Sequence, residues 1–371
     1  MKVLICGGGT GGHIYPALSA VDELNNMGIP LDDILWIGTQ GEIEESLIPK
    51  HGLRLETIVG GAIVGVPWRE RVVNLTKLAW SLGKASRIMG SFKPSVLFMT
   101  GGYVNAPVAT AAWLRRIPSV IFLPDVEPGL AIRELSRFAK RVACATEASL
   151  SYFKPGKGVV TGYPVRGLLQ EATSIDKVEA LARFNLKDGR PTLFVFGGSR
   201  GARSINRALM TGLEQLLEYI QVIHISGTLD WAEVKENGNS LSDGPRAFYR
   251  AYPYLHEEMG LAFRAADLVV ARAGASMLGE GPAFGLPAIL VPYPHAWRYQ
   301  KVNADYLEER GAAMTIRDED LREKLVEMVL ELTLNRARLD DISAAAKSLA
   351  APDSATNLAQ LVMDIGSGAV K

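Results

Sequence analysis

The chain has 371 residues, and its 40 Lys and Arg residues balance 40 Asp and Glu residues to a formal net charge of zero. Hydrophobic residues make up 48% and charged residues 22%, which is typical of a globular protein of about two domains and excludes a disordered chain. The charge balance also argues against a non-specific nucleic-acid binder, so any anion site must be local. Cys6 and Cys144 have no CxxC or histidine companions, so we expect two buried thiols in a reducing compartment and no cysteine-based zinc site.

No targeting or membrane-spanning segment is expected. The first six residues run directly into glycines and carry no signal-peptide pattern, which predicts that the protein stays inside the cell. The longest apolar stretches, residues 106–114 and 286–292, are well short of the about 20 residues that a transmembrane helix needs.

Short apolar runs alternate with helix-length segments along the chain, which is the pattern of a parallel α/β sheet. The predicted strands are residues 2–6, 34–37, 95–99, 119–122, 158–160, 192–196, 222–225, 268–271 and 288–291. The predicted helices include residues 15–27, 72–89, 204–217, 321–334 and 355–364. Most of these strands are continuously apolar, as strands covered on both faces should be.

An internal similarity divides the chain. Residues 3–12 and 193–202 share one layout, an apolar strand followed by a glycine loop and a helix, which favours two Rossmann-like halves. The segment 161–165 carries the Gly and Pro of an interdomain connection. The predicted domains are 1–163 and 164–351. The residue pattern allows the last helix, in 352–371, to pack on either half, and we assign it to the first.

Three glycine loops follow predicted strands, at residues 7–12, 100–103 and 197–202. Such loops let a ligand approach the backbone and direct helix-terminal N–H groups at an anion, so they are candidate phosphate sites at the carboxyl ends of the strands. The first loop departs from the G-x-G-x-x-G fingerprint, and neither it nor the loop at 197–202 has the Lys-Ser/Thr of a Walker loop. NAD and ATP are therefore disfavoured.

The loops and their surroundings resemble the MurG family of bacterial glycosyltransferases. The matching motifs are residues 8–17, 101–103, 162–166, 197–202, 273–280 and 285–287, together with Gln300 and Asn303. The resemblance covers nearly the whole chain in order. It implies the GT-B fold, with two Rossmann-like parallel-sheet domains facing a cleft. It also implies transfer of N-acetylglucosamine from UDP-GlcNAc to lipid I at the inner face of the cytoplasmic membrane, which forms lipid II for peptidoglycan.

The resemblance also assigns site residues, with the acceptor and membrane on the first domain and UDP-GlcNAc on the second. The implied donor-binding residues are Thr10, Gly11, Gly12, His13, Arg166, Ser199, Arg200, Gly201, Ala275, Ser276, Glu280, Gln300 and Asn303. The implied acceptor-binding residues are Gly101, Gly102, Tyr103 and Asp125. Arg166 and Ser199 correspond to ligands of the donor diphosphate, and Glu280 to the ligand of both ribose hydroxyls. Tyr299 stands where the family usually has a second glutamine.

The implied reaction is a direct, inverting displacement, with His13 or Asp125 as the general base. Preorganised donors would stabilise the charge of the departing UDP without a metal. The only D-x-D-like run, residues 318–320, precedes an apolar-periodic segment and is interpreted as a helix N-terminus favoured by acidic residues. We therefore expect no essential metal ligand set and no cofactor.

The segment 122–125 departs from the family, because Phe-Leu-Pro-Asp stands where His-Glu-Gln-Asn is usual. Asp125 is a candidate acceptor ligand or base, and a helix-capping role is an equal alternative. Three alternative functions stay open. They are a GT-B transferase acting on another lipid-linked acceptor, a UDP-GlcNAc 2-epimerase, and a non-catalytic sugar-nucleotide-binding scaffold. Residues 254–259 match the family's uracil-binding segment poorly.

Apolar bulk and cations occur together in residues 66–87 and 113–116, including Trp80, Trp113, Lys84 and Arg87. Such a surface suits anionic headgroups and predicts a peripheral protein on the cytoplasmic side of the membrane. The alternative is a helix whose apolar side packs into the core.

Overall fold

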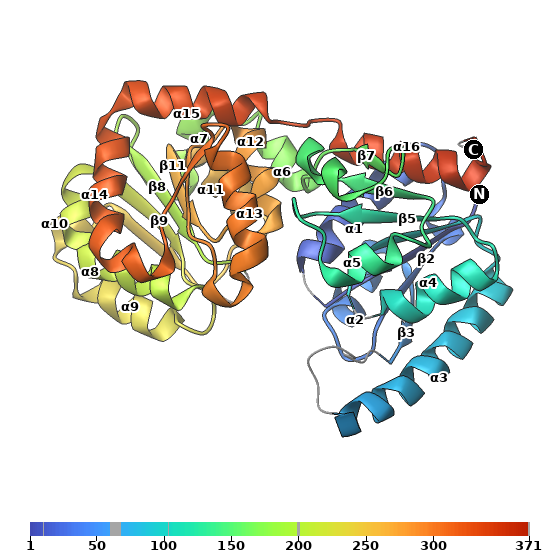
Figure 1. Ribbon diagram of the computed structural model, residues 1–371. Helices are drawn as coiled ribbons and strands as arrows, with labels where there is room; N and C mark the ends of the chain where they lie inside the picture. The colour runs from blue at the N-terminus through green and yellow to red at the C-terminus, as the bar shows by residue number, and fades with distance from the viewer. Residues whose placement is uncertain (10, 60–67, 103, 199–200, 370–371) are drawn as a thin grey trace. The chain divides into compact units, whose positions relative to one another are not determined.

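The computed structural model describes residues 1–9, 11–59, 68–102, 104–198 and 201–369 (Figure 1). The chain forms two compact units, each built around its own sheet. Unit 1 comprises Met1–Arg166 and Asp353–Lys371, and unit 2 comprises Gly167–Pro352.

The sheet of unit 1 is parallel throughout, with the strand order β3-β2-β1-β4-β5-β6-β7. Its strands are β1 (Val3–Gly7), β2 (Ile34–Thr39), β3 (Arg54–Ile58), β4 (Val96–Gly101), β5 (Ser119–Leu123), β6 (Arg141–Cys144) and β7 (Gly158–Val160). Every residue of β1, β4 and β5 is buried, because helices cover both faces of the sheet centre.

The helices of unit 1 are α1 (Gly11–Asn26), α2 (Glu44–Leu47), α3 (Trp68–Phe92), α4 (Asn105–Leu114), α5 (Leu130–Leu135) and α16 (Ser354–Ser367). The last helix, α16, packs on α1 and β4 of unit 1 (Figure 1). Its close approach needs Gly366, where a Cβ would lie 2.6 Å from the Sδ of Met1 and 3.1 Å from Val96. The Ser354 hydroxyl also donates to the Tyr163 carbonyl at 2.9 Å.

Unit 2 has a second parallel sheet, in the order β10-β9-β8-β11-β12-β13. Its strands are β8 (Thr192–Phe196), β9 (Gln221–Ile225), β10 (Tyr249–Tyr252), β11 (Leu268–Ala271), β12 (Ala288–Leu290) and β13 (Ala313–Thr315). Its helices are α6 (Gly167–Ala172), α7 (Lys177–Arg183), α8 (Arg203–Tyr219), α9 (Trp231–Ser240), α10 (Asp243–Arg246), α11 (Met259–Ala265), α12 (Glu280–Phe284), α13 (Trp297–Glu308), α14 (Leu321–Leu334) and α15 (Arg336–Ser348).

Both sheets follow one doubly wound plan. When the strands are counted from the first of each unit, both sheets have the Rossmann order 3-2-1-4-5-6, and unit 1 adds β7. The order reverses between β1 and β4 in unit 1 and between β8 and β11 in unit 2. Ligands of such folds bind beside the carboxyl ends of the strands at these switch points. The predicted fold class, α/β with two Rossmann-like parallel sheets, is confirmed.

Four strands were not among the predicted ones, namely β3, β6, β10 and β13. Three of them, β3, β10 and β13, lie at sheet edges. An edge strand is covered less completely, so it keeps exposed or half-buried residues, such as Arg54 and Glu56 in β3. Such strands do not show as continuous apolar runs.

The two cysteines are free and buried, as predicted. Burial raises the pKa of the Cys144 thiol to about 12 and the pKa of Cys6 well above its ordinary value, so both thiols stay protonated. Among the described residues, no helix is long and apolar enough to cross a membrane.

Candidate functional site

Apart from Arg166, the predicted site residues of unit 1 that the structure describes lie at or just after the ends of β1, β4 and β5. His13 is in the first turn of α1, and its Nδ1 lies 3.3 Å from the Gly8 carbonyl oxygen. A carbonyl only accepts, so Nδ1 carries the proton, and Nε2 of the neutral ring is the unprotonated nitrogen. A Cβ added to Gly101 would lie 2.7 Å from Nε2, so the ring rests on the bare Cα of that glycine.

The loops after β1 and β4 contact each other through glycine. Gly102 has a φ of +97°, and a Cβ there would lie 2.9 Å from the Gly8 carbonyl oxygen. A side chain at Gly102 would therefore be both strained and too close. The structure thus brings together the predicted residues His13, Gly101 and Gly102.

Arg166 joins this group from the end of unit 1. Its guanidinium carbon lies 4.6 Å from the centre of the Tyr15 ring, which is cation–π range. The same ring lies 3.0 Å from where a Cβ on Gly11 would be. A fixed cation therefore stands over the first turn of α1, where the helix dipole already favours an anion.

Two buried polar atoms flank the glycines after β4. Thr100 Oγ1 and Asn105 Oδ1 have no hydrogen-bond partner among the described residues, and both side chains are buried. Unpaired buried polar atoms are rare in proteins. Their position beside Gly101 and Gly102 supports a polar ligand at this end of the sheet.

The altered segment, residues 122–125, begins with the last two residues of β5, which are apolar. Phe122 and Leu123 are completely buried, and Phe122 packs edge-on against Tyr163 with ring centres 6.0 Å apart. Asp125 is half-buried, and Ser149 Oγ lies 3.4 Å from its backbone carbonyl. Glu127, two residues further on, is 8% exposed and was not among the predicted site residues. In the sequence, only the closeness of Glu127 to Asp125 could have pointed to it.

Unit 2 holds the third predicted glycine loop, between β8 and α8. Gly201 has a φ of +80°, and a Cβ there would overlap the Ser226 carbonyl oxygen, so only glycine fits. Ala202 caps α8 without a side-chain hydrogen bond, so the capping residue leaves the first N–H groups of this 17-residue helix to other acceptors. This geometry suits a phosphate. Thr10, Tyr103, Ser199 and Arg200 lie outside the described residues.

A buried polar chain fixes the base of that loop. Asn206 Nδ2 donates to the Ser226 carbonyl at 2.8 Å and to Asp230 Oδ2 at 2.9 Å. Its Oδ1 must therefore accept, which places a proton on His224 Nε2 at 2.9 Å. His224 Nδ1 then accepts from the Tyr249 hydroxyl at 2.7 Å. Burial lowers the pKa of His224 to about 3, so the imidazole of His224 stays neutral.

The other predicted donor residues lie after β11 and on α13. Ala275 and Ser276 form the turn Ala275–Leu278, and Glu280 begins α12 at 6% exposure, which rules out a solvated surface glutamate. Asn303 is buried and donates to the Ala273 carbonyl at 3.2 Å. Gln300 Oε1 accepts from the Tyr293 N–H at 2.9 Å.

The sequence prediction missed Arg272, which follows β11. Its guanidinium pairs with Asp318, donates to Ser204 Oγ at 2.8 Å, and lies 5.2 Å from the centre of the Tyr293 ring. It thereby joins the start of α8, the 3-10 turn before α14 and the loop after β12. Asp318, in the D-x-D-like run, is thus held in an ion pair at the start of a short 3-10 turn before α14.

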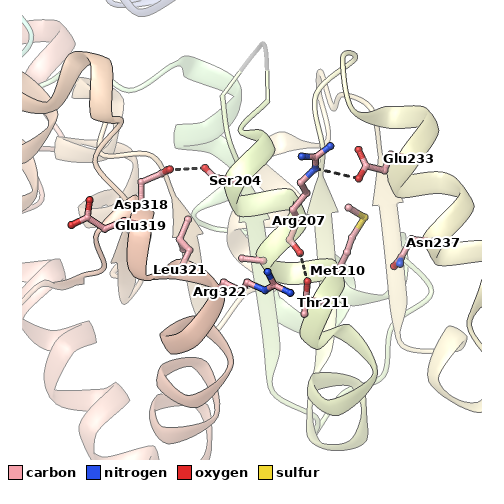
Figure 2. Close-up of a pocket in the computed structure, with 11 residues that line it drawn as sticks. Ser204, Arg207, Met210, Thr211, Glu233, Asn237, Asp318, Glu319, Leu321 and Arg322 are labelled. Atoms are coloured by element: carbon pink, nitrogen blue, oxygen red, sulfur yellow. Dashed lines mark hydrogen bonds and ion pairs between the residues drawn. The ribbon is translucent and has the colours of Figure 1, made fainter.

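A cavity of about 500 Å³ lies beside α8 in unit 2 (Figure 2). Charges of both signs line it, with Arg207 paired to Glu233 at 3.3 Å and Ser204 Oγ bonded to Asp318 at 2.7 Å (Figure 2). None of the predicted donor residues that the structure describes lines this cavity.

Comparisons with known proteins cover nearly the whole chain. Residues 3–144 match the glycosyltransferase family 28 N-terminal domain, and residues 192–358 match the glycosyltransferase family 28 C-terminal domain. Curated relatives named UDP-N-acetylglucosamine--N-acetylmuramyl-(pentapeptide) pyrophosphoryl-undecaprenol N-acetylglucosamine transferase are 36% identical in Desulforamulus reducens and 33% identical in Bacillus subtilis. Each alignment spans 98% of this chain and 99% of the relative.

Solved structures give the same assignment of fold. The crystal structure of Acinetobacter baumannii MurG matches with a TM-score of 0.76 and 26% identity, over 98% of this chain and 99% of that one. UDP-GlcNAc 2-epimerase from Neisseria meningitidis matches with a TM-score of 0.67 and 12% identity, over 98% of this chain and 100% of that one. At that identity the epimerase shares the fold alone. The predicted GT-B fold is confirmed.

Proposed function

The chain belongs to the MurG family of N-acetylglucosamine transferases, and from this premise we propose that it transfers N-acetylglucosamine from UDP-GlcNAc to lipid I, forming lipid II. The acceptor atom is the 4-hydroxyl of the MurNAc unit of undecaprenyl-pyrophosphoryl-MurNAc-pentapeptide. The observation that carries the proposal is 36% identity to a curated transferase over 98% of this chain and 99% of the relative.

Unit 2 supplies the donor half of the proposed site. The N-terminus of α8 and the loop at Gly201 would hold the diphosphate, because the geometry leaves N–H groups for an anion. Glu280 would accept from the ribose hydroxyls. Gln300 and Asn303 would contact the sugar from α13, and the polar bonds that both make to neighbouring loops support a fixed orientation.

Unit 1 supplies the acceptor half and the proton acceptor. His13 Nε2 would take the proton of the 4-hydroxyl as that oxygen bonds to C1 of GlcNAc and the bond from C1 to UDP breaks. The Gly8 carbonyl would stabilise the resulting imidazolium through its bond to Nδ1–H. Arg166 would offset the charge of the departing UDP as a fixed cation. Displacement at the face opposite UDP inverts the anomeric centre.

The end of β5 and the loop that follows it favour a test of other acceptors. Phe122 and Leu123 are in the core, so this segment would meet an acceptor through Asp125 and Glu127 and not through the usual His-Glu-Gln-Asn side chains. A second candidate function is therefore transfer to a different lipid-linked acceptor by the same donor chemistry.

A surface of unit 1 supports docking to a membrane that carries the acceptor. Trp80 on α3 and Trp113 and Leu114 at the end of α4 are 59%, 54% and 62% exposed. The neighbouring cations Lys77, Arg87, Arg115 and Arg116 are also exposed. Leu82, Ala85 and Met89 pack into the core, so only part of α3 faces outward. Residues 66 and 67 of the predicted surface lie outside the described residues.

UDP release tests the proposed function. Purified protein with UDP-GlcNAc should release UDP only when a soluble lipid I analogue is added. An acceptor panel separates the two transferase candidates. Release of ManNAc or UDP-ManNAc without any acceptor would instead indicate an epimerase.

A further inference from the structure

Glu44, the first residue of α2, is a completely buried carboxylate next to the first glycine loop. Each of its oxygens accepts a backbone hydrogen bond. Oε1 accepts from the Thr39 N–H at 3.0 Å, and Oε2 accepts from the Gly9 N–H at 3.2 Å. One carboxylate therefore joins the last residue of β2 to the loop after β1.

The backbone around Glu44 has the shape that this carboxylate requires. A Cβ on Gly8 would overlap Oε1, and a Cβ on Gly38 would lie 2.8 Å from Cγ of Glu44. Neither glycine has a positive φ. The need for glycine at these two positions therefore comes from the space that Glu44 fills and not from backbone conformation.

Consecutive glycines are otherwise the least constrained backbone in a protein. Here a separate side chain bonds to the backbone of each of the three glycines at residues 7–9. Trp36 Nε1 donates to the Gly7 carbonyl at 2.9 Å, Glu44 holds the Gly9 N–H, and His13 Nδ1 donates to the Gly8 carbonyl at 3.3 Å. Trp36 and Glu44 are buried and fix the loop, so the carbonyl that orients His13 has a fixed place.

These two N–H groups hold the Glu44 side chain. Among the described residues, no lysine, arginine or histidine forms an ion pair with it. An ionised carboxylate accepts at both oxygens, whereas a carboxamide accepts at only one. Replacing it by glutamine would thus face an NH2 group against the N–H of either Thr39 or Gly9 and break that hydrogen bond.

We propose that Glu44 is a positioning residue of the acceptor half of the site. It sets the place of the Gly8 carbonyl and thereby the orientation and tautomer of His13, and it touches no substrate. This inference rests on the proposed function above for its kinetic consequence.

The variant E44Q tests this with E45Q as a matched control, because Glu45 lies on the same helix and is exposed. We expect E44Q to lower kcat for transfer to the lipid I analogue about ten- to a hundredfold, through a displaced base. The dissociation constant of UDP should stay within about twofold, since most of the implied donor residues, among them Gly201, Glu280 and Asn303, lie in unit 2. E45Q should match the wild type. Unchanged kcat in folded E44Q, or an equal loss of UDP binding, would overturn the proposal.

Nitrogen NMR of His13 gives a readout that needs neither activity nor the variant. The resonance is assigned by its loss in H13Q. The neutral ring of the wild-type protein should carry its proton on Nδ1, and E44Q should shift the population toward Nε2–H. An Nε2–H tautomer in the wild type would refute the positioning role of Glu44 even if E44Q does not fold. If the wild type transfers no sugar, the proposed function fails, while the tautomer still decides whether Glu44 positions His13.

Discussion

At the scale of single residues, the proposed chemistry depends on which nitrogen of His13 is unprotonated. The bond from Nδ1 to the Gly8 carbonyl leaves Nε2 as the basic nitrogen, and Nε2 rests against Gly101. Two other groups of unit 1 could take the proton, the carboxylates of Asp125 and Glu127, which lie in the loop after β5.

Replacing His13 by alanine should therefore lower kcat by about 10²- to 10⁴-fold, the usual contribution of a general base. D125N and E127Q should have smaller effects on kcat and larger effects on the KM for the acceptor. Single-turnover transfer separates these cases. If H13A keeps full activity and D125N or E127Q loses it, the base is the carboxylate.

We predict that the buried, neutral His224 makes the free energy of unfolding depend on pH. Burial lowers its pKa to about 3 from an ordinary value of 6.5, although Asp230 opposes the shift. In the unfolded chain, His224 binds a proton as the pH falls below about 6.5. In the folded chain, it binds that proton only below about pH 3. The free energy of unfolding should thus fall by about 1.4 kcal/mol per pH unit as the pH drops through this window, with no contribution from this group above it.

Hydrogen exchange of the β9 amides, followed from pH 7 to pH 4, measures this dependence. The non-titrating variant H224Q should be less stable at pH 7, because it breaks bonds to Asn206 and Tyr249, and its pH slope should be flatter. Equal slopes in the two proteins would show that His224 is not buried in the neutral form.

At the scale of elements, the sequence predicted the sheet centres and the loops that follow them. Continuous apolar runs marked β1, β4, β5, β8 and β11, which carry the candidate site at their carboxyl ends. Edge strands such as β3 and β10 were missed because their partly exposed residues weaken that pattern. Glu44 and Arg272 were missed for a different reason, since each acts through partners distant in sequence and has no local motif.

We predict that UDP binding depends on Gly201 in the glycine loop before α8. G201A forces a Cβ into the Ser226 carbonyl at a φ of +80°, so the loop must move away from its phosphate-binding geometry. We expect UDP to bind about tenfold more weakly, equivalent to one lost charge-assisted hydrogen bond. Calorimetric titration with UDP measures this.

G244A is the matched control for that titration. Gly244 lies in α10 of the same unit, without a positive φ and with open space around a would-be Cβ. It should bind UDP like the wild type. If G201A binds UDP equally well, the loop at 197–202 does not hold the diphosphate.

At the scale of the whole molecule, the fold does not identify the reaction. A 2-epimerase shares the architecture at 12% identity, whereas the transferase relatives align with nearly the full length at 33–36% identity. Function therefore follows from family membership and from the site residues, and not from two Rossmann-like units alone.

We predict that the exposed tryptophans of unit 1 contribute to membrane binding. The wild type should float with anionic vesicles and bind less at high salt, because salt screens the cations. W80A/W113A should bind several-fold less, since it removes the apolar contact. Y219A, which removes an exposed aromatic residue from unit 2, should bind like the wild type. Equal flotation of all three proteins would place the membrane contact elsewhere.

The product of the reaction distinguishes the proposed transfer from its alternatives. Purified protein is incubated with UDP-GlcNAc and a soluble lipid I analogue, and the product is analysed by mass spectrometry and NMR. We predict a gain of one N-acetylhexosamine, joined in the β configuration to the MurNAc 4-hydroxyl, with one UDP released per sugar transferred. UDP-GlcNAc binding without transfer, or an N-acetylhexosamine joined elsewhere or in the α configuration, would show that the protein does not form lipid II.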